Sequence, residues 1–332
     1  MDILITGASG FLGRHIVKNL LKKNFKVHAL ILPCDSTPKI IDPNLKYFPG
    51  NVLDKYSLKK AMINCQAIIH AAGATNLKKL SPAALQNLNV LGTKQVCEVA
   101  KLLNIKKLIF VSSLGTLGGN TKPKVLTENS PADNFQTLSH YYLTSKRQSE
   151  ALAFSEQSNN FKVISVLPAM LWGPEDWFLS SIRYAWWAWQ KRTLYYTENT
   201  GMSILDITDA AQGVVNALLY GRAGQKYLLA GENITAKKMC QFIAQHPNIE
   251  VNLKKISAAA IKTLKLLTSG LVFLKFNLYE LSDILNYTQL YWWGDSRLAK
   301  KEINFKTNYS AQEAITRSLD WLKDNYSYLN IN

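Results

Sequence analysis

Tyrosine followed four residues later by lysine occurs twice in this chain, at Tyr56 with Lys60 and at Tyr142 with Lys146. On a helix these positions share one face, and an ammonium group beside a phenol stabilises the phenolate and lowers the tyrosine pKa. Such a tyrosine can pass a proton to or from a substrate oxygen while hydride moves to or from a nicotinamide. Tyr142 opens the helix expected after a strand at 107–113, whereas Tyr56 falls on an early peripheral helix, so position favours Tyr142 and Lys146.

A glycine-rich turn, Thr6-Gly-Ala-Ser-Gly-Phe-Leu-Gly13, joins the first apolar run to the first expected helix. Glycines let the backbone turn tightly and approach a pyrophosphate, and the helix N-terminus presents unpaired N–H groups and partial positive charge to the anion. The strand before the turn and the helix after it supply the context that such a motif needs. We therefore expect the turn to hold a dinucleotide through Gly7, Gly10, Phe11, Leu12 and Gly13.

Predicted strands and helices alternate along the first half of the chain, and these elements must position the residues described above. Short apolar runs predict strands at 2–6, 26–32, 45–50, 67–72, 107–113 and 162–169, and helices are expected at about 11–23, 54–64, 80–104 and 138–158. This alternation predicts an α/β fold with a mostly parallel sheet covered on both faces. After Pro168 the alternation fades and aromatic residues become frequent. We therefore expect a dinucleotide-binding domain at 1–170, and mainly a substrate-binding region at 171–332 with some segments returning to the main sheet.

The charge and the cysteines limit the class of protein. The formal net charge is +16, but the excess is scattered, mostly as separate Lys-Lys pairs, so we expect solvated lysines and no nucleic-acid partner. Four cysteines lie far apart with no C-x-x-C spacing, which argues against a metal site or a disulfide framework and fits a reducing cytosol. The start of the chain has no signal-peptide pattern, and the apolar stretch 266–274 is about half a membrane span, so we expect a cytoplasmic protein.

The spacing G-x-x-G-x-x-G resembles that of the extended short-chain dehydrogenase/reductases, which include the nucleotide-sugar epimerases. The pattern Tyr142-Leu-Thr-Ser-Lys146 with Glu150 is similar to the family's Y-x-x-S-K-x-x-x-E. Further similar segments span nearly the whole chain: Gly50-Asn-Val-Leu-Asp54, His70-Ala-Ala72, Asn89-Val-Leu-Gly-Thr93, Leu167-Pro168 with Gly173-Pro174, Leu205-Asp-Ile-Thr-Asp-Ala-Ala211, and Tyr291-Trp-Trp-Gly-Asp-Ser296 with Ala299. The last of these resembles the dihydroflavonol-reductase-like branch.

The resemblance implies a Rossmann doubly wound parallel sheet and roles for particular residues. Ser113 lies five residues before Gly118, the spacing at which family members place the Ser or Thr that holds the substrate carbonyl, so Ser113 is favoured over Ser112. The cofactor contacts that carry over by position are Asn51, Val52, Ala71, Ala72, Lys146 and Pro168. Asn51 and Leu167 stand where the family's patterns have Asp and Arg, which weakens the cofactor assignment in detail.

The second strand and the turn bear on whether the cofactor is NADP or NAD. An acidic residue ending the second strand would bind a ribose 2′-OH and favour NAD, and a nearby arginine would favour NADP. That strand ends Ile31-Leu-Pro33 with neither, and Asp35 comes a few residues too late. Arg14, directly after the last glycine of the turn, could reach a 2′-phosphate, so NADP is slightly favoured.

Two positions disfavour a sugar nucleotide as the substrate. Sugar epimerases of the family commonly carry Asn where Met170 stands, and sugar dehydratases place Asp-Glu where Leu114 and Gly115 stand. Large aromatic residues after position 170 instead suit an apolar pocket, although they could equally pack the smaller region itself: Trp177, Phe178, Trp186, Trp187 and Trp189. We therefore expect reduction of a ketone on a bulky hydrophobic molecule, or oxidation of the matching alcohol, with Tyr142 as proton donor or acceptor.

Other interpretations remain open. One is a nucleotide-sugar epimerase with tightly bound NAD. Another is a lipid- or sterol-type dehydrogenase that contacts a membrane surface, because 183–192 mixes aromatic and basic residues and 256–278 adds lysines among Leu and Phe. Relatives often form homodimers through a helix pair, which here would be parts of 80–104 and 138–158.

Overall fold

Seven parallel strands form the central sheet of the described chain, and apolar runs identified in the sequence supply six of them. The structure, a computed structural model, describes residues 1–74, 80–131, 141–273, 285 and 288–325, without the side chains of 188 and 269–273. The strands are β1 (Asp2–Thr6), β2 (Lys26–Ile31), β3 (Leu45–Pro49), β4 (Ala67–His70), β5 (Lys107–Val111), β7 (Lys162–Pro168) and β11 (Lys226–Leu229). The α/β class and the parallel sheet expected from the sequence are confirmed.

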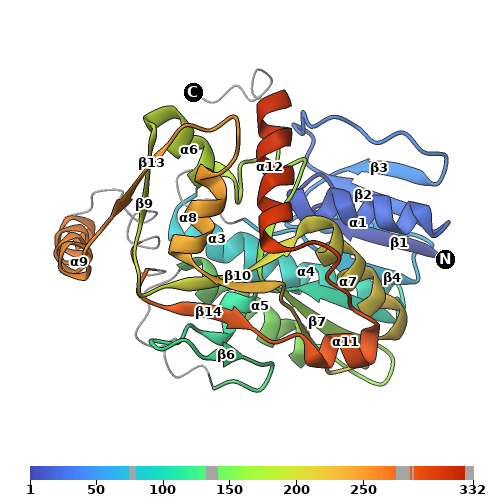
Figure 1. The fold of residues 1–332 in the computed structure, drawn as a ribbon. Coiled ribbons are helices and arrows are strands. Elements are labelled where there is room, and N and C mark those ends of the chain that lie inside the picture. Colours follow the sequence, from blue (N-terminus) through green and yellow to red (C-terminus); the bar gives the residue numbers. More distant parts are fainter. Residues whose placement is uncertain (75–79, 132–140, 274–284, 286–287, 326–332) are drawn as a thin grey trace.

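The strand order is β11-β7-β5-β4-β1-β2-β3, which is a doubly wound Rossmann sheet (Figure 1). The chain moves outward from β1 in one direction through β2 and β3, and then in the other direction through β4, β5, β7 and β11. The order therefore reverses between β1 and β4, and ligands of such sheets bind at the carboxyl ends of the strands beside this reversal. The glycine turn after Thr6 and the segment after His70 both lie there.

Helices cover both faces of the sheet because each has one apolar side. Helices α1 (Phe11–Lys22), α7 (Ile207–Tyr220) and α11 (Arg297–Ile303) pack on one face, and α2 (Lys55–Met62), α4 (Gly92–Leu102) and α5 (Tyr141–Ser155) pack on the other. In α1, Ile16 and Leu20 are four residues apart and fully buried, while Lys18 between them is partly exposed. The two cores hold the strand ends in fixed positions.

The single helix expected at 80–104 is interrupted. It consists of α3 (Pro82–Gln86), a π-helical turn η1 (Asn87–Leu91) and α4. A π turn inside a helix frequently marks a functional site, because it redirects side chains that an unbroken helix would place elsewhere. The helix expected at 138–158 is α5, and the expected residues 138–140 lie outside the described part of the chain.

A second layer of elements packs beside the carboxyl edge of the main sheet, and we call it the lobe. Its sheet contains β12 (Glu232–Thr235), β10 (Gly201–Asp206), β14 (Tyr291–Gly294) and β6 (Val125–Leu126), with β8 (Met170–Trp172) also paired to β10. Helices α6 (Arg183–Lys191), α8 (Ala236–Ala244) and α12 (Ala311–Asn325) enclose its apolar core. Thus β11 returns to the main sheet before β12 continues the lobe.

The far end of the lobe is a thin projection. Strands β9 (Thr193–Tyr196) and β13 (Asn252–Lys255) pair in parallel as a two-stranded ribbon, and α9 (Ala258–Phe273) follows. Figure 1 shows α9 at the edge of the molecule, on the side opposite β1, β2 and β3. Among the helices that the structure describes, none combines the length and the apolar character needed to cross a membrane.

Candidate active site

Tyr142 is the second residue of α5, and Ser113 is the second residue beyond β5. The two hydroxyls share a hydrogen bond, and Ser113 Oγ also accepts the N–H of Gly115 at 3.2 Å. Burial raises the pKa of Tyr142 to about 12, against the lowering effect of the Ser113 hydrogen bond. The expectation of a lowered Tyr142 pKa is therefore wrong for this structure, because burial dominates, and Tyr142 is a neutral phenol at pH 7.

Lys146 lies one helical turn beyond Tyr142, and its ammonium group is held below the carboxyl end of β5. The Nζ atom donates to the Val111 carbonyl oxygen at 2.6 Å and lies 4.5 Å from the centre of the Phe110 ring. Burial lowers the pKa of Lys146 to about 8, with Glu150 acting in the opposite direction. A side chain that is buried yet still mostly protonated at pH 7 is a fixed positive charge beside Tyr142.

The second Tyr-x-x-x-Lys pair, Tyr56 with Lys60, lies away from this site. Tyr56 lies on α2 and is 77% exposed, and Lys60 on the same helix is also exposed. An exposed phenol is surrounded by water and has no enclosed substrate position next to it. The structure thus brings together Ser113, Tyr142 and Lys146 at one strand end, and it leaves Tyr56 on the surface.

A directed chain of hydrogen bonds fixes the strand end beside the site. Thr6 Oγ1 accepts the Ala72 N–H at 3.2 Å and lies 2.6 Å from His70 Nδ1, and Thr93 Oγ1 lies 3.0 Å from His70 Nε2. Since Thr93 donates to the Asn89 carbonyl at 2.7 Å, it accepts from His70, so the imidazole carries its proton on Nε2. Burial lowers the pKa of His70 to about 3, which keeps the ring neutral.

Asn89 in the π turn connects this chain to α5. Its Nδ2 donates to Ser145 Oγ at 2.8 Å, and its Oδ1 accepts the Ala74 N–H at 3.0 Å. Ser145 in turn donates to the Tyr142 carbonyl at 2.7 Å. In the sequence, Asn89 stood out only as part of a family-like segment. In the structure it connects the 71–74 segment to the first turn of α5. This role depends on the π turn, which the apolar pattern did not predict.

The glycine turn has the shape that a pyrophosphate requires. Gly7 has φ +69°, a conformation that favours glycine, and a Cβ there would lie 2.7 Å from the Ala72 nitrogen. A Cβ at Gly13 would overlap the Gly7 carbonyl oxygen. No side chain caps the start of α1 at Gly10, whereas α2, α3, α7 and α8 are each capped by an Asp, Ser or Thr. The uncapped N–H groups, including those of Phe11 and Leu12, therefore suit an anionic ligand.

The remaining expected cofactor contacts border the same edge of the sheet or lie close to it. Asn51 Oδ1 accepts the Leu53 N–H at 3.0 Å, and Val52 is buried against Gly92 of α4. Ala71 and Ala72 directly follow β4, where the Ala71 N–H donates to the Thr6 carbonyl at 3.2 Å. Pro168 ends β7 and is paired with Leu229 of β11.

Arg14 is already engaged by protein groups. Its Nε lies 3.2 Å from Glu175 Oε2 and its Nη1 donates to the Pro38 carbonyl at 2.5 Å. Lys18 also pairs with Glu175, and His15 Nε2 lies 3.0 Å from the Pro174 carbonyl oxygen. Burial lowers the pKa of His15 to about 4. Sequence reasoning missed this cluster, which we call the α1 latch, because about 160 residues separate its two sides and nothing in the motif on either side indicates that they touch.

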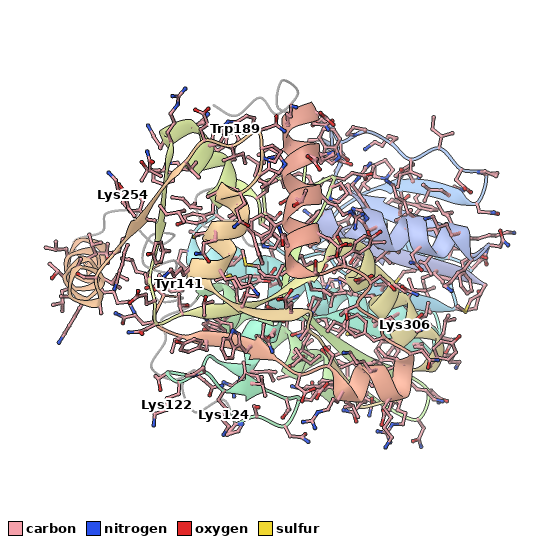
Figure 2. The ribbon with its side chains drawn as sticks, viewed as in Figure 1. Lys122, Lys124, Tyr141, Trp189, Lys254 and Lys306 are labelled. Atoms are coloured by element: carbon pink, nitrogen blue, oxygen red, sulfur yellow. The ribbon has the colours of Figure 1, made fainter. Side chains whose placement is uncertain are left out.

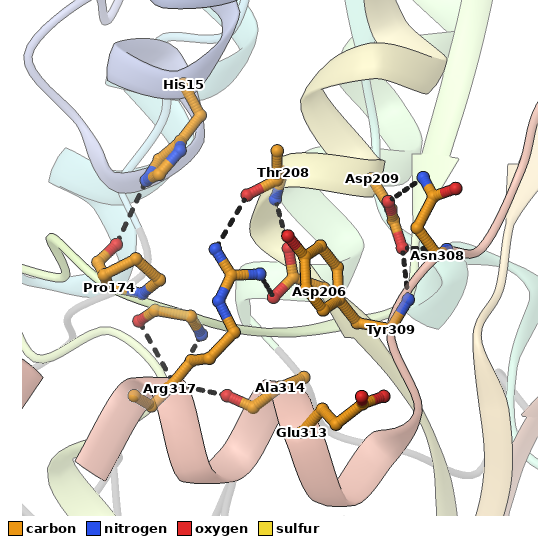
Figure 3. Close-up of polar contacts among 12 residues, drawn as sticks. His15, Pro174, Asp206, Thr208, Asp209, Asn308, Tyr309, Glu313, Ala314 and Arg317 are labelled. Carbon is orange, nitrogen blue, oxygen red and sulfur yellow. Dashed lines mark hydrogen bonds and ion pairs between the residues drawn. The ribbon is translucent and has the colours of Figure 1, made fainter. Parts of the chain in front are cut away.

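Helix α12 anchors the lobe to α7 at the same edge (Figure 3). Arg317 Nη1 pairs with Asp206 at 2.6 Å, and Asp206 caps α7 by accepting the Thr208 N–H at 2.7 Å. Asp209 accepts the Asn308 backbone N–H at 2.7 Å. The latch and this anchor together place the lobe over the carboxyl ends of the main strands.

The aromatic residues of the lobe divide into packed and exposed ones. Trp186 and Trp189 pack against the lobe core, and Trp177 makes an edge-on contact with Trp321 at 5.0 Å between ring centres. Phe178 and Trp187 are 52% and 39% exposed. Most of these tryptophans therefore stabilise the lobe, which was the second of the two interpretations that the sequence allowed.

The surroundings of Tyr142 are apolar. Its side chain packs against a cluster formed by η2 (Leu114–Leu117), β14 and neighbouring strands, which includes Leu114, Leu167 and Trp292 and is bordered by Ala169 and Met202. A separate cavity of about 220 Å³ lies at the base of α9 and is lined by none of the three candidate catalytic residues. The chemistry is therefore assigned from the side-chain arrangement at β5 and not from that cavity.

Fold and site together define a class of protein. A dinucleotide-shaped glycine turn beside a buried Tyr–Lys pair, on a doubly wound sheet, is the architecture of NAD(P)-dependent oxidoreductases of the extended short-chain dehydrogenase/reductase type.

The chain belongs to the NAD dependent epimerase/dehydratase family, whose model matches residues 3–230. It is 26% identical over 237 residues to a putative dihydroflavonol 4-reductase of Synechocystis sp., covering 70% of this chain and 68% of that protein. It is 24% identical over 268 residues to 4-hydroxy-2-methyl-3-oxo-4-farnesyl-3,4-dihydroquinoline-1-oxide ketoreductase of Stigmatella aurantiaca, covering 79% and 78%. The dTDP-glucose 4,6-dehydratase DesIV of Streptomyces venezuelae, solved with NAD bound, has the same fold, with a TM-score of 0.78, 19% identity and coverage of 99% and 98%.

Proposed function

We propose that this enzyme reduces a ketone on a bulky hydrophobic molecule, or oxidises the matching alcohol, with Tyr142 as the proton donor or acceptor. The observation that carries the proposal is the hydrogen bond between the Ser113 and Tyr142 hydroxyls in an apolar setting at the end of β5. Two hydroxyls that converge on one point can both contact a single carbonyl oxygen.

Ser113, Tyr142 and Lys146 have different roles in the proposed reaction. A reduced nicotinamide dinucleotide, held at the glycine turn and the uncapped start of α1, would supply a hydride for the carbonyl carbon. Ser113 holds the carbonyl oxygen, and Tyr142 transfers its phenolic proton to that oxygen as the C–O double bond becomes a single bond. The Lys146 ammonium, whose pKa is lowered by burial to about 8 and which is still mostly protonated at pH 7, stabilises the phenolate that remains. Burial holds Tyr142 in its protonated form, the form that can donate a proton to a carbonyl oxygen.

The substrate class follows from the surroundings of Tyr142 and from the relatives. Leu114, Ala169 and Met202 offer no hydrogen-bonding side chain to a sugar or a diphosphate. The curated relatives include, besides the two reductases above, sterol demethylase protein B of Methylococcus capsulatus. Names of this kind refer to large ring or isoprenoid skeletons, which supports a hydrophobic carbonyl as the substrate here.

For the cofactor we infer NADP(H) in preference to NAD(H). Asp35, the nearest acidic residue after β2, is held by Lys39 at 2.6 Å and by Thr37 at 2.9 Å, so its carboxylate is not available for a ribose 2′-OH. Arg14 contacts the same loop through the Pro38 carbonyl. The Arg14 guanidinium has N–H groups beyond the two that contact Glu175 and Pro38, and these could donate to a 2′-phosphate near this loop.

Substitution of Tyr142 by Phe tests the catalytic assignment. Tyr142→Phe should lower kcat at least a thousandfold and leave the Kd of NADPH within about twofold, because the phenol donates a proton but does not anchor the cofactor. Tyr56→Phe, which changes the exposed member of the second Tyr-x-x-x-Lys pair, is the matched control and should retain full activity. Activity that survives Tyr142→Phe would show that another group donates the proton.

The nucleotide itself separates a reductase from the epimerase alternative. A reductase exchanges its cofactor in every cycle, so protein denatured after purification should release little nucleotide, and the apo protein should bind NADPH more tightly than NADH. Arg14→Ala should weaken NADPH binding more than NADH binding. Retained NAD that does not exchange would instead indicate a nucleotide-sugar epimerase.

A homodimer through α3, α4 and α5 stays a prediction, to be tested by light scattering.

A further inference from the structure

The outward side of α9 exposes several leucines, contrary to the usual pattern of a surface helix. Ile261 and Thr268 point inward, with 1% and 4% of their surface exposed. Leu264, Leu266 and Leu267 are 41%, 69% and 59% exposed. A surface helix normally turns its leucines toward the core, and an outward cluster marks a contact site for another molecule.

The β9–β13 ribbon that leads into α9, together with the adjoining α6, also exposes apolar and aromatic side chains. Leu253 of β13, Tyr195 of β9 and Trp187 of α6 are each between 36% and 39% exposed. The rings of Trp187 and Tyr195 lie 6.3 Å apart. Figure 1 shows α6, β9, β13 and α9 on the same side of the molecule. Trp and Tyr are the aromatic residues enriched where an apolar phase meets water.

Lysines accompany these apolar residues, and acidic residues are missing from this part of the sequence. Residues 251–279 contain no Asp or Glu, but they contain five lysines, of which Lys254, Lys255, Lys262 and Lys265 fall in the described chain. Lys254 points away from the molecule at this end (Figure 2). Lys255 pairs with Glu198 of the adjoining loop at 2.6 Å. The local charge is thus positive, which complements an anionic surface.

Exposed leucines and lysines on the same helix favour a lipid surface over a protein partner. Lysines are depleted in the cores of protein–protein interfaces, whereas here they alternate with exposed leucines on one helix. At a bilayer surface, lysine stems lie along the acyl boundary while the ammonium groups reach lipid phosphates. We propose that the outward face of α9 and the adjoining β9–β13 ribbon form a docking surface for an anionic phospholipid bilayer. The surface would bring the enzyme to the phase in which bulky hydrophobic substrates partition.

The test measures binding of the whole chain to vesicles and requires no turnover, so its outcome is independent of the proposed reaction. The protein is sedimented with extruded vesicles of phosphatidylcholine alone, or of phosphatidylcholine with 30% phosphatidylglycerol, at about 50 mM and 300 mM salt. We expect binding to the anionic vesicles at low salt, much weaker binding to phosphatidylcholine, and loss of binding at high salt. Absence of binding to anionic vesicles at low salt overturns the proposal.

Variants locate the surface. The double substitution Leu266→Ser and Leu267→Ser should weaken binding to anionic vesicles about tenfold or more, and Lys254→Gln with Lys262→Gln should weaken it about fivefold for each lysine. Leu102→Ser changes a leucine of α4 that is 68% exposed, and Lys306→Gln changes a lysine at the opposite end of the molecule (Figure 2). Both controls should bind as the native protein does.

Two results would assign α9 to a different role. Equal binding by the native protein and the double leucine variant would place the lipid contact elsewhere. A dimer seen by light scattering without vesicles, and lost in the leucine variant, would show that a second copy of the chain covers α9. Circular dichroism and activity on a water-soluble ketone should be unchanged in all variants, since none of these residues lies near Tyr142.

Discussion

The sheet half and the lobe treat their buried polar groups differently. In the sheet half, Thr6, His70 and Thr93 form a chain in which each donor meets an acceptor. In the lobe, five buried polar atoms have no hydrogen-bond partner within the described chain: Trp172 Nε1, Trp177 Nε1, Trp186 Nε1, Thr197 Oγ1 and Ser203 Oγ. Within the same limits the sheet half has two such atoms, on Asn19 and Ser112.

The difference shows which interactions specify each region. A buried donor or acceptor without a partner costs about 1–3 kcal/mol, whereas a satisfied network contributes rigidity as well as stability. The sheet half is therefore held in one arrangement by polar groups at fixed positions. The lobe has satisfied buried groups too, such as Asp176, which accepts the Ser180 and Ser181 N–H groups at 2.8 Å. Its core nevertheless depends more on the volume of large aromatic and aliphatic side chains and contains more uncompensated polar atoms, so polar contacts specify its geometry less strictly.

Acidification provides the largest test of this contrast. The folded pKa of His70 is about 3 and that of His15 is about 4, both below the unfolded value of 6.5. The stability that these neutral rings contribute is complete above pH 6.5 and is lost as the pH falls toward the folded values. Each histidine should therefore remove about 2 kcal/mol from the free energy of unfolding between pH 7 and pH 5, measured by urea denaturation.

The variant His15→Gln isolates one of the two contributions. Glutamine can still donate to the Pro174 carbonyl but does not titrate in this range, so about half of the loss on acidification should disappear. If the variant loses as much stability between pH 7 and pH 5 as the native protein, His15 is not held neutral by burial in the folded state.

Thr6→Val tests the polar network directly and should have the next largest effect. Valine has the same shape, but it leaves the Ala72 N–H and His70 Nδ1 without their partner. The free energy of unfolding should fall by about 2–3 kcal/mol. A loss below about 0.5 kcal/mol would mean that the network contributes little and that packing specifies both halves of the molecule.

The same contrast explains what the sequence could predict. Six strands of the main sheet and the glycine turn are local patterns that the sequence shows directly. Tyr142 and Lys146 share one helix, and their position after the 107–113 strand separated them from the equally spaced Tyr56 and Lys60. The π turn at Asn89, the pairing of β9 with β13 and the contact of Arg14 with Glu175 join distant segments through individual atoms. Apolar periodicity carries no information about such contacts. The tryptophans after position 170 were visible in composition, but composition did not separate packing from ligand contact.

Ser203→Ala in the lobe is the counterpart of Thr6→Val and should have the smallest effect. The Ser203 hydroxyl is buried on β10 with no partner among the described residues. Its removal should leave the free energy of unfolding unchanged or raise it by up to about 1 kcal/mol, because an uncompensated polar group is lost with little volume. A loss of about 2 kcal/mol, measured by the same urea denaturation, would show that this hydroxyl has a partner and would remove the contrast between the two regions.

The α1 latch also bears on whether nucleotide and substrate influence each other's binding. Arg14 and Lys18 follow the glycine turn proposed to bind the dinucleotide, and Glu175 belongs to the segment that leads into the lobe. Any displacement of α1 on nucleotide binding therefore reaches the lobe through these ion pairs. Thermodynamic reciprocity then requires that nucleotide and substrate change each other's affinity by the same factor. We therefore expect the nucleotide to change the Kd of the substrate in the native enzyme, and the two dissociation constants to become independent in a Glu175→Gln enzyme.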